Sequence, residues 1–226
     1  MTTQKKKVYN FAITMAIAIV LLVVALFVSI LLGEAKVNVT TIFEAIFSYD
    51  VTNQQHNIIS EIRIPRDIGA ILVGAALATS GAVVQGVTKN GLADPSLIGL
   101  NAGASFTLAL TFALYPKAPF LMLMVAGFVG AILGGFIVLM IGRSRSDGFN
   151  PMRIILAGAA VSAFLTALSQ GVALFFRLNQ DLTFWSAGGV SGTTWHQLIW
   201  AIPVIVIALL ILITISKQLT ILKLGE

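Results

Sequence analysis

Long apolar runs separated by short polar turns constrain the fold of this chain more than any other feature. Charged residues make up only 10% of the chain, against about 25% in a soluble domain. Backbone groups in lipid must bond within their own segment, and unbroken runs favour helices over the alternating pattern of a barrel. The sequence therefore predicts an all-α fold, a polytopic membrane helix bundle that forms a single domain over residues 1–226. About six transmembrane helices are expected, over Phe11–Leu32, Ile68–Val87, Ser96–Leu114, Pro119–Ile141, Ile154–Phe176 and Leu198–Ile215.

The first run resembles a signal peptide in one respect, because Lys5, Lys6 and Lys7 precede it. Its apolar stretch of about 22 residues exceeds the 7–15 of a signal sequence, so we interpret it as a retained helix. A long polar segment follows, in which Thr40–Phe47 spaces its apolar residues as a short interfacial helix does. The connection Arg177–Gln197 carries aromatic residues, which prefer the boundary between membrane and water.

Basic residues are divided unevenly between the two sides of such a bundle. If the N-terminus lies inside and six spans alternate, nine basic residues fall in inner segments and five in outer segments. This bias follows the positive-inside rule and predicts a cytoplasmic N-terminus. The net charge of +5 is thereby explained by orientation rather than by binding of nucleic acid.

Small residues recur on one face of several expected spans. Residues four apart share a helix face, and small side chains there allow two helix backbones to approach closely in a membrane. We expect such packing in the second span at Gly74, Ala78, Gly81 and Gly86. The fourth span carries a similar stripe at Gly127, Ala131 and Gly135. These stripes do not distinguish helices that move against one another from static packing.

The sequence lacks the motifs of common catalytic sites, namely G-x-x-x-x-G-K-[ST], H-E-x-x-H and G-x-S-x-G. The chain is therefore not expected to hydrolyse ATP or to act as an enzyme. Cysteine is absent, and the two histidines, His56 and His196, fall in expected outer loops as solvated residues, so no metal site is predicted. All acidic residues lie in loops or near span ends, which argues against a proton-coupled carrier and favours energy supplied by a partner.

The polar turn Asn90–Pro95 separates the second and third spans. Pro95 disfavours helix at the preceding residue, and Asp94 is suited to cap the helix that follows. Gly91 makes the turn permissive. From residue types alone, a plain connector and a functional loop remain equally open.

Specific residues around this turn carry a resemblance to a known family. The order of residues closely resembles the permease subunits of ABC importers for iron–siderophores, haem and cobalamin. The matching residues are Arg63-Ile-Pro-Arg66, Gly74-Ala-Ala-Leu-Ala78, Ser80-Gly81-Ala82, Gln85-Gly86, Asn90, Leu92-Ala-Asp-Pro95 and Gly99-x-x-Ala-Gly103. Ile155-Leu-Ala-Gly158, Trp185-x-x-Gly-Gly189 and Ile221–Glu226 extend the similarity over nearly the whole chain. The family usually has Pro where this chain has Gly91, and its members have about ten spans, so the chain looks like the N-terminal part of such a permease.

The resemblance implies an assembly as well as a fold. It implies two permease chains, which are identical or different, together with two ATPase subunits and an extracytoplasmic solute-binding protein, in contact with membrane lipid. ATP is used by the partner ATPase, and no cofactor is bound by this chain. The resemblance also implies a bacterial cytoplasmic membrane as the location.

Site residues are implied position by position. Arg63 and Arg66 match the outer end where the binding protein docks, with Arg66 expected to sit deeper; the alternative is that they snorkel or pair with Glu61 and Asp67. A cytoplasmic gate is implied at Asn90, Leu92, Asp94, Pro95, Asn150 and Pro151, although the last two differ from the small hydroxyl residues usual there. Gly225 and Glu226 match the first residues of the segment that couples to the ATPase.

The function implied is translocation of an iron–siderophore chelate. Haem and cobalamin remain open as cargo. Two alternatives come from other classes: a membrane-embedded enzyme, disfavoured by the missing catalytic residues, and a non-transporting truncated membrane scaffold.

Overall fold

The computed structural model describes residues 3–143 and 151–224. The regular structure in these ranges consists of α-helices with one π-helical and one 3-10 segment, and these ranges contain no strand. The predicted all-α fold is therefore confirmed. The chain divides into two compact units. The first comprises Met1–Ile71 and Val190–Leu198, and the second Leu72–Gly189 and Ile199–Glu226. The expectation of one domain over residues 1–226 stays a prediction, because compactness alone does not define a domain.

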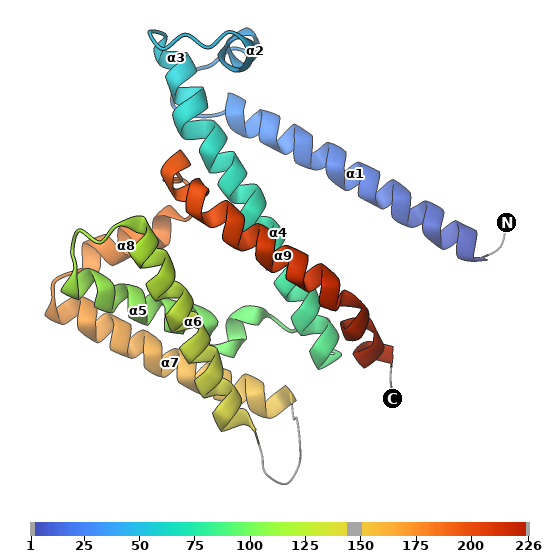
Figure 1. The fold of residues 1–226 in the computed structure, drawn as a ribbon, viewed down its shortest axis with the longest axis vertical. Helices are drawn as coiled ribbons and strands as arrows, with labels where there is room; N and C mark the ends of the chain where they lie inside the picture. Colours follow the sequence, from blue (N-terminus) through green and yellow to red (C-terminus); the bar gives the residue numbers. More distant parts are fainter. Residues whose placement is uncertain (1–2, 144–150, 225–226) are drawn as a thin grey trace. The chain divides into compact units, whose positions relative to one another are not determined.

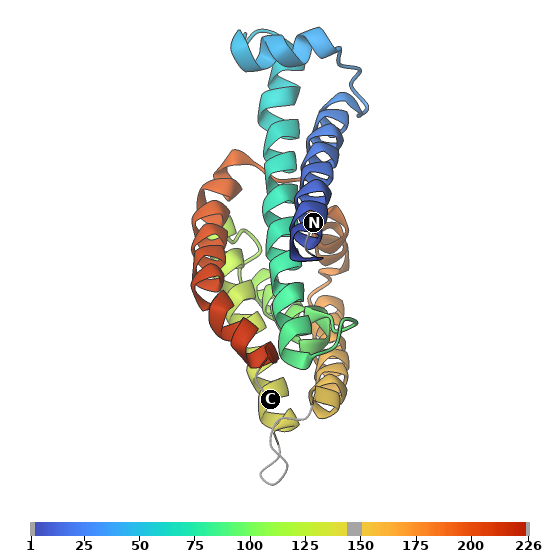
Figure 2. The same ribbon diagram turned by 90° about the vertical axis from the view of Figure 1, so that its right-hand side faces the viewer.

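The first unit begins with α1 (Thr3–Leu31), followed by α2 (Val39–Phe47) and the single turn α3 (Gln54–Asn57) (Figure 1). The π-helical segment η1 (Ile58–Arg63) then leads directly into α4 (Ile64–Thr88). Figure 2 shows α2 lying across the beginning of this long helix. The core beneath α2 consists of Val37, Ile42, Ala45 and Ile59. The short helix predicted over Thr40–Phe47 is confirmed as α2, which buries Ile42 and Ala45 on one face.

A distant segment completes the first unit. The indole N–H of Trp195 donates a hydrogen bond of 2.8 Å to the carbonyl oxygen of Ser60. A Cβ placed on Gly69 would lie 3.0 Å from the hydroxyl oxygen of Thr193. The absence of a side chain at Gly69 thus lets residues 190–198 lie against the first turns of α4.

The second unit contains the remainder of α4, the 3-10 turn η2 (Pro95–Ile98), α5 (Leu100–Leu114), α6 (Phe120–Gly142) and α7 (Pro151–Phe175). The short helix α8 (Asn179–Gly188) follows, and α9 (Trp195–Leu224) ends the described chain. Helices α5, α6 and α7 lie side by side (Figure 1). Buried Ala102, Val138, Val161 and Leu165 from these three helices form the core of the unit.

Glycines determine how closely α5 and α6 approach. A Cβ added to Gly103 would overlap the carbonyl oxygen of Gly130, and one added to Gly134 would lie 2.6 Å from that of Gly99. The Thr107 hydroxyl on α5 donates a hydrogen bond of 2.8 Å to the carbonyl oxygen of Ala126 on α6. The two helices therefore meet backbone to backbone, as small residues allow in membranes.

Five helices among the described residues are long and apolar enough to cross a membrane. They span Tyr9–Leu31, Gln54–Thr88, Phe120–Gly142, Met152–Phe175 and Trp195–Ser216. The third expected span is shorter than predicted: its helix begins at Leu100 rather than Ser96, because Gly99 adopts a left-handed conformation with φ of 79°. The second begins earlier than predicted, because α3, η1 and α4 are continuous from Gln54.

Candidate functional site

Two backbone hydrogen bonds terminate α4. The N–H of Asn90 bonds to the carbonyl oxygen of Gln85 at 3.2 Å, and the N–H of Lys89 bonds to that of Gly86 at 3.4 Å. Lys89 between them has a φ of 51°. This pair of bonds around a left-handed residue is a Schellman motif, which ends a helix sharply and satisfies its last carbonyls.

Asn90 then braces the turn that follows. Its side-chain oxygen accepts a hydrogen bond of 2.9 Å from the N–H of Leu92, and its carbonyl oxygen accepts one of 3.2 Å from the N–H of Ala93. Ala93 is buried, whereas Leu92 is 91% exposed. The Leu92 side chain therefore projects away from the second unit, and hydrogen bonds from Leu92 and Ala93 to Asn90 fix the backbone of the turn that carries it.

Asp94 and Pro95 start the next element. The Asp94 carboxylate accepts a hydrogen bond of 2.8 Å from the N–H of Ser96 and caps η2, whose first residue is Pro95. This bond, together with a bond from the Ser96 hydroxyl, lowers the pKa of Asp94 below its usual value. The predicted capping role of Asp94 is confirmed, although the element it caps is a 3-10 turn.

The other expected gate residues and the expected coupling residues are mostly outside the described ranges. Asn150, Gly225 and Glu226 lie outside the described residues. Pro151 is the first residue of α7. The roles of these four residues stay predictions.

A second group of site residues lies where α1 ends and α4 begins. Arg63 is only 4% exposed. Its guanidinium donates to the carbonyl oxygens of Ile30, Leu31 and Ala35, with 2.6 Å to Ala35 and 3.4 Å to Leu31. A cation at the C-terminus of α1 satisfies carbonyls that have no helical partner and complements the helix dipole.

Arg66 makes a different set of contacts. Its guanidinium donates to the carbonyl oxygen of Ser29 at 3.0 Å and to the Ser29 hydroxyl at 2.9 Å, and lies 3.4 Å from the Asp67 carboxylate. Ser29 also donates to Asp67 at 2.8 Å. The Arg66 side chain is 29% exposed. Arg63 is the more buried of the two residues, because its side chain reaches across to the end of α1. The alternative pairing with Asp67 is found for Arg66. The expected depth of Arg66 in the membrane stays a prediction.

The expected packing face of α4 meets no partner within the described part of the chain. A Cβ at Gly74, Gly81 or Gly86 would have no heavy atom within 4 Å. A packing role for these residues and Ala78 stays a prediction. The close contact observed instead joins α5 and α6. The stripe expected on the fourth span is found there only in part, since a Cβ on Gly135 would lie 2.8 Å from a methyl group of Leu100 on α5. The backbone crossing itself, at Gly130 and Gly134, was missed. Its signal was present in the sequence as Gly99-x-x-x-Gly103 and Gly130-x-x-x-Gly134.

The histidine expected as a solvated loop residue at position 56 is buried. His56 is 4% exposed, and its Nδ1 accepts a hydrogen bond of 3.1 Å from the N–H of Asp50. The burial follows from the packing of α3 against α2. Among the described residues, no three His, Asp or Glu side chains gather as they would around a metal ion.

Comparisons with known proteins show what this chain is similar to. The FecCD transport family matches residues 21–226. The iron(3+)-hydroxamate import system permease protein FhuB of Bacillus subtilis (strain 168) is 38% identical, over 97% of this chain and 57% of that protein. The ferric enterobactin transport system permease protein FepD of Escherichia coli (strain K12) is 36% identical, over 96% of this chain and 66% of that protein.

A solved structure is similar as well. A metal-chelate type ABC transporter in an inward-facing conformation matches with a TM-score of 0.73 and 25% identity. The match covers 92% of this chain and 63% of the transporter chain. The chain thus spans about three fifths of the length of the curated relatives it matches.

Proposed function

The chain belongs to the FecCD transport family, and from that membership we propose that it is a permease subunit of a binding-protein-dependent ABC importer. The proposed cargo is an iron–siderophore chelate, because relatives named for iron(3+)-hydroxamate and ferric enterobactin match nearly its whole length. Haem is the second candidate, since the hemin transport system permease protein HmuU of Yersinia pestis is 30% identical over 89% of this chain. Cobalamin remains a third cargo for the same fold.

The observation that carries the proposal is the braced turn after α4. Leu92 is 91% exposed at its tip, and Asn90 holds the backbone of the tip in place. An apolar side chain on a rigid support suits a constriction that closes by excluding water. In a permease dimer, Leu92 from each copy would face the shared pathway, with Asp94 and Pro95 setting the direction of the chain beyond it. Asn150 and Pro151 are proposed for the neighbouring gate loop.

Docking of the binding protein is proposed at Arg63 and Arg66, with carboxylates of the partner as counterions. Arg66 offers the more accessible guanidinium, with 29% of its side chain exposed. Arg63 would have to exchange its carbonyl partners on α1 for a carboxylate. Docking at Arg63 is therefore coupled to the end of α1, whereas docking at Arg66 is coupled to Ser29 and Asp67.

Energy and orientation complete the proposal. Two partner ATPases supply ATP hydrolysis, and the segment around Gly225 and Glu226 receives their motion. The membrane is the bacterial cytoplasmic membrane, with the N-terminus inside, because nine of the 14 basic residues then face the cytoplasm.

The test is affinity capture of the full-length native protein from its own membranes, with identification of its partners, followed by uptake in the same cells. An ATPase and a solute-binding protein in the complex, with uptake of radiolabelled iron–hydroxamate that requires the chain, are the expected results. Uptake of haem or cobalamin instead would change the cargo. Absence of both partners and of uptake would favour the non-transporting scaffold.

A further inference from the structure

The second unit contains a partly open apolar cavity of about 210 Å³ beside the turn after α4. Its walls come from the last turns of α4, from η2, and from the facing ends of α6 and α7. Most of the apolar lining comes from branched aliphatic side chains, among them Val84, Val87, Ile98, Leu139 and Ile154. A cavity that holds one water needs only about 10–15 Å³, so this space takes a much larger ligand.

The polar groups in the lining are already engaged within the protein. The Thr88 hydroxyl donates to the carbonyl oxygen of Val84 at 2.7 Å. The Asp94 carboxylate accepts from the N–H of Ser96. A polar solute would lose its hydration in this cavity and gain few hydrogen bonds in return, which is unfavourable. The chemistry of the lining therefore selects an apolar occupant.

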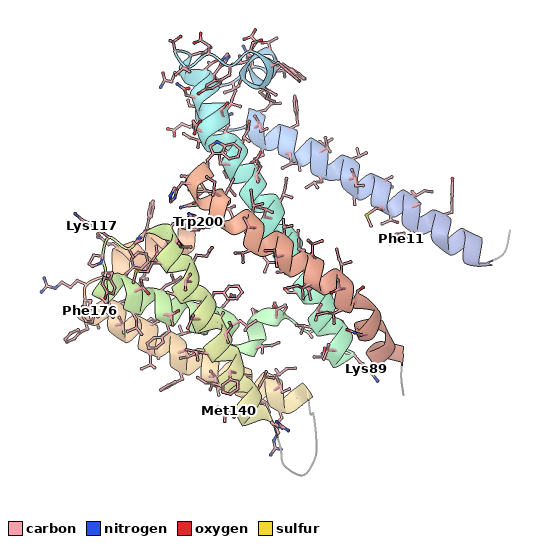
Figure 3. All side chains as sticks on the ribbon, in the orientation of Figure 1. Phe11, Lys89, Lys117, Met140, Phe176 and Trp200 are labelled. Atoms are coloured by element: carbon pink, nitrogen blue, oxygen red, sulfur yellow. The ribbon has the colours of Figure 1, made fainter. Side chains whose placement is uncertain are left out.

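Basic residues lie at the ends of the three helices, α4, α6 and α7, that line the cavity. Lys89 directly follows the last residue of α4, Arg143 caps the end of α6, and Arg153 lies in the first turn of α7. All three side chains are exposed. Figure 3 labels Lys89 at the end of α4 and Met140 near the end of α6. Among the described residues that line the cavity, Asp94 is the only carboxylate, and the cations Lys89 and Arg143 directly follow two of its walls.

We propose that this cavity binds one acyl chain of an anionic phospholipid, whose phosphate lies between Lys89 and Arg143. Basic pockets between membrane helices are suited to anionic headgroups, and each nearby Lys or Arg contributes about 1 kcal/mol of attraction to an anionic surface. A second copy of this chain fits the site less well, because its own basic residues would meet like charges. The inference stands independently of the proposed import function.

Binding of lipid here has a consequence for the turn. Ala93 and Asp94 contribute to the cavity wall, so an acyl chain would support the backbone that carries Leu92. The lipid site therefore connects membrane composition with the position of the proposed gate residue.

The experiment uses the full chain in nanodiscs of equal parts phosphatidylglycerol and phosphatidylcholine with identical acyl chains, followed by native mass spectrometry of the released protein. The wild type should retain phosphatidylglycerol preferentially. Val84→Phe fills the cavity and should lower retained phosphatidylglycerol by about tenfold, the loss expected for two displaced methylene groups. Leu77→Phe, on an exposed face of α4 (63% exposed), is the matched control and should retain lipid as the wild type does.

A second pair of variants tests the headgroup. Lys89→Asn combined with Arg143→Gln should lower retained phosphatidylglycerol by about thirtyfold. Asn is chosen because it tolerates the left-handed backbone of position 89. Lys117→Gln serves as the charge control. Equal retention of the two lipids by the wild type would overturn the proposal, as would unchanged retention in both Val84→Phe and a second filling variant, Ala93→Leu.

Discussion

The guanidinium of Arg63 donates a hydrogen bond to the carbonyl oxygen of Ala35, with 2.6 Å between Nη2 and that oxygen. Its other terminal nitrogen bonds to the carbonyl oxygens of Ile30 and Leu31. The last carbonyls of a helix have no partner within it, and a positive charge at that end is stabilising. One side chain at the end of η1 thereby caps α1 and holds the chain that leaves it.

Replacement of Arg63 should loosen this end of the first unit. We expect Arg63→Gln to lower the free energy of unfolding by about 3 kcal/mol, because charge-assisted bonds are lost and buried carbonyls are left without partners. Reversible unfolding in mixed micelles, followed by circular dichroism, measures the change. Lys117→Gln is the control and should have no effect. An unchanged free energy in Arg63→Gln would mean that the α1 carbonyls are satisfied by other groups.

The close crossing of α5 and α6 should not tolerate a methyl group. In Gly134→Ala the new Cβ would lie 2.6 Å from the carbonyl oxygen of Gly99, so the helices must separate. We expect a loss of about 2 kcal/mol in the same unfolding assay, typical of overpacking. Gly81→Ala is the matched control: its Cβ meets no described atom within 4 Å, and Ala is the better helix former. Equal losses in both variants would contradict the observed crossing.

The proposed gate predicts a leak when its apolar tip becomes polar. In the assembled importer, Leu92→Ser should raise flux of the iron chelate without ATP, because a polar tip no longer excludes water from the constriction. Leu92→Met keeps an apolar tip and should remain tight. Proteoliposomes loaded with radiolabelled chelate measure the flux. If both variants leak to the same extent, Leu92 is not the constricting residue.

Acid should weaken the cap formed by Asp94. Hydrogen bonds from Ser96 hold the pKa of Asp94 below the ordinary value of 3.8 in the folded chain, so the unfolded chain binds this proton more readily. The contribution of the cap is fully present above that ordinary value and is lost as the pH falls through the lowered one. Asp94→Asn keeps a side-chain acceptor without the titration.

The comparison is therefore between two pH profiles of the unfolding midpoint. The wild type should lose more stability on acidification than Asp94→Asn, and the two should differ least in acid. Parallel profiles would show that the charge of Asp94 does not contribute to the cap.

Local features of the sequence were predictive because their causes are local. The apolar runs that became α1, α6 and α7 have the composition and length of membrane helices, whatever they pack against. The Asp94 carboxylate accepts a hydrogen bond from the N–H of a residue only two positions ahead. Its capping role could therefore be predicted from the order Asp-Pro-Ser. The helix start at Leu100 was missed because several glycines were candidates for a left-handed backbone, and only the contact with α6 selects Gly99. A Cβ there would lie 2.9 Å from a methyl group of Val138.

The sequence by itself determined the class of fold, the approximate positions of the helices, and the turn that carries Asn90, Leu92 and Asp94. The tertiary structure alone decided the partners of Arg63, which lie 28 to 33 residues earlier in the chain. It also decided which glycines meet at the α5–α6 crossing, and that an apolar cavity lies beside the turn. The physical reason is range: hydropathy and capping act within a few residues, whereas a buried cation and a helix crossing depend on segments that only folding brings together.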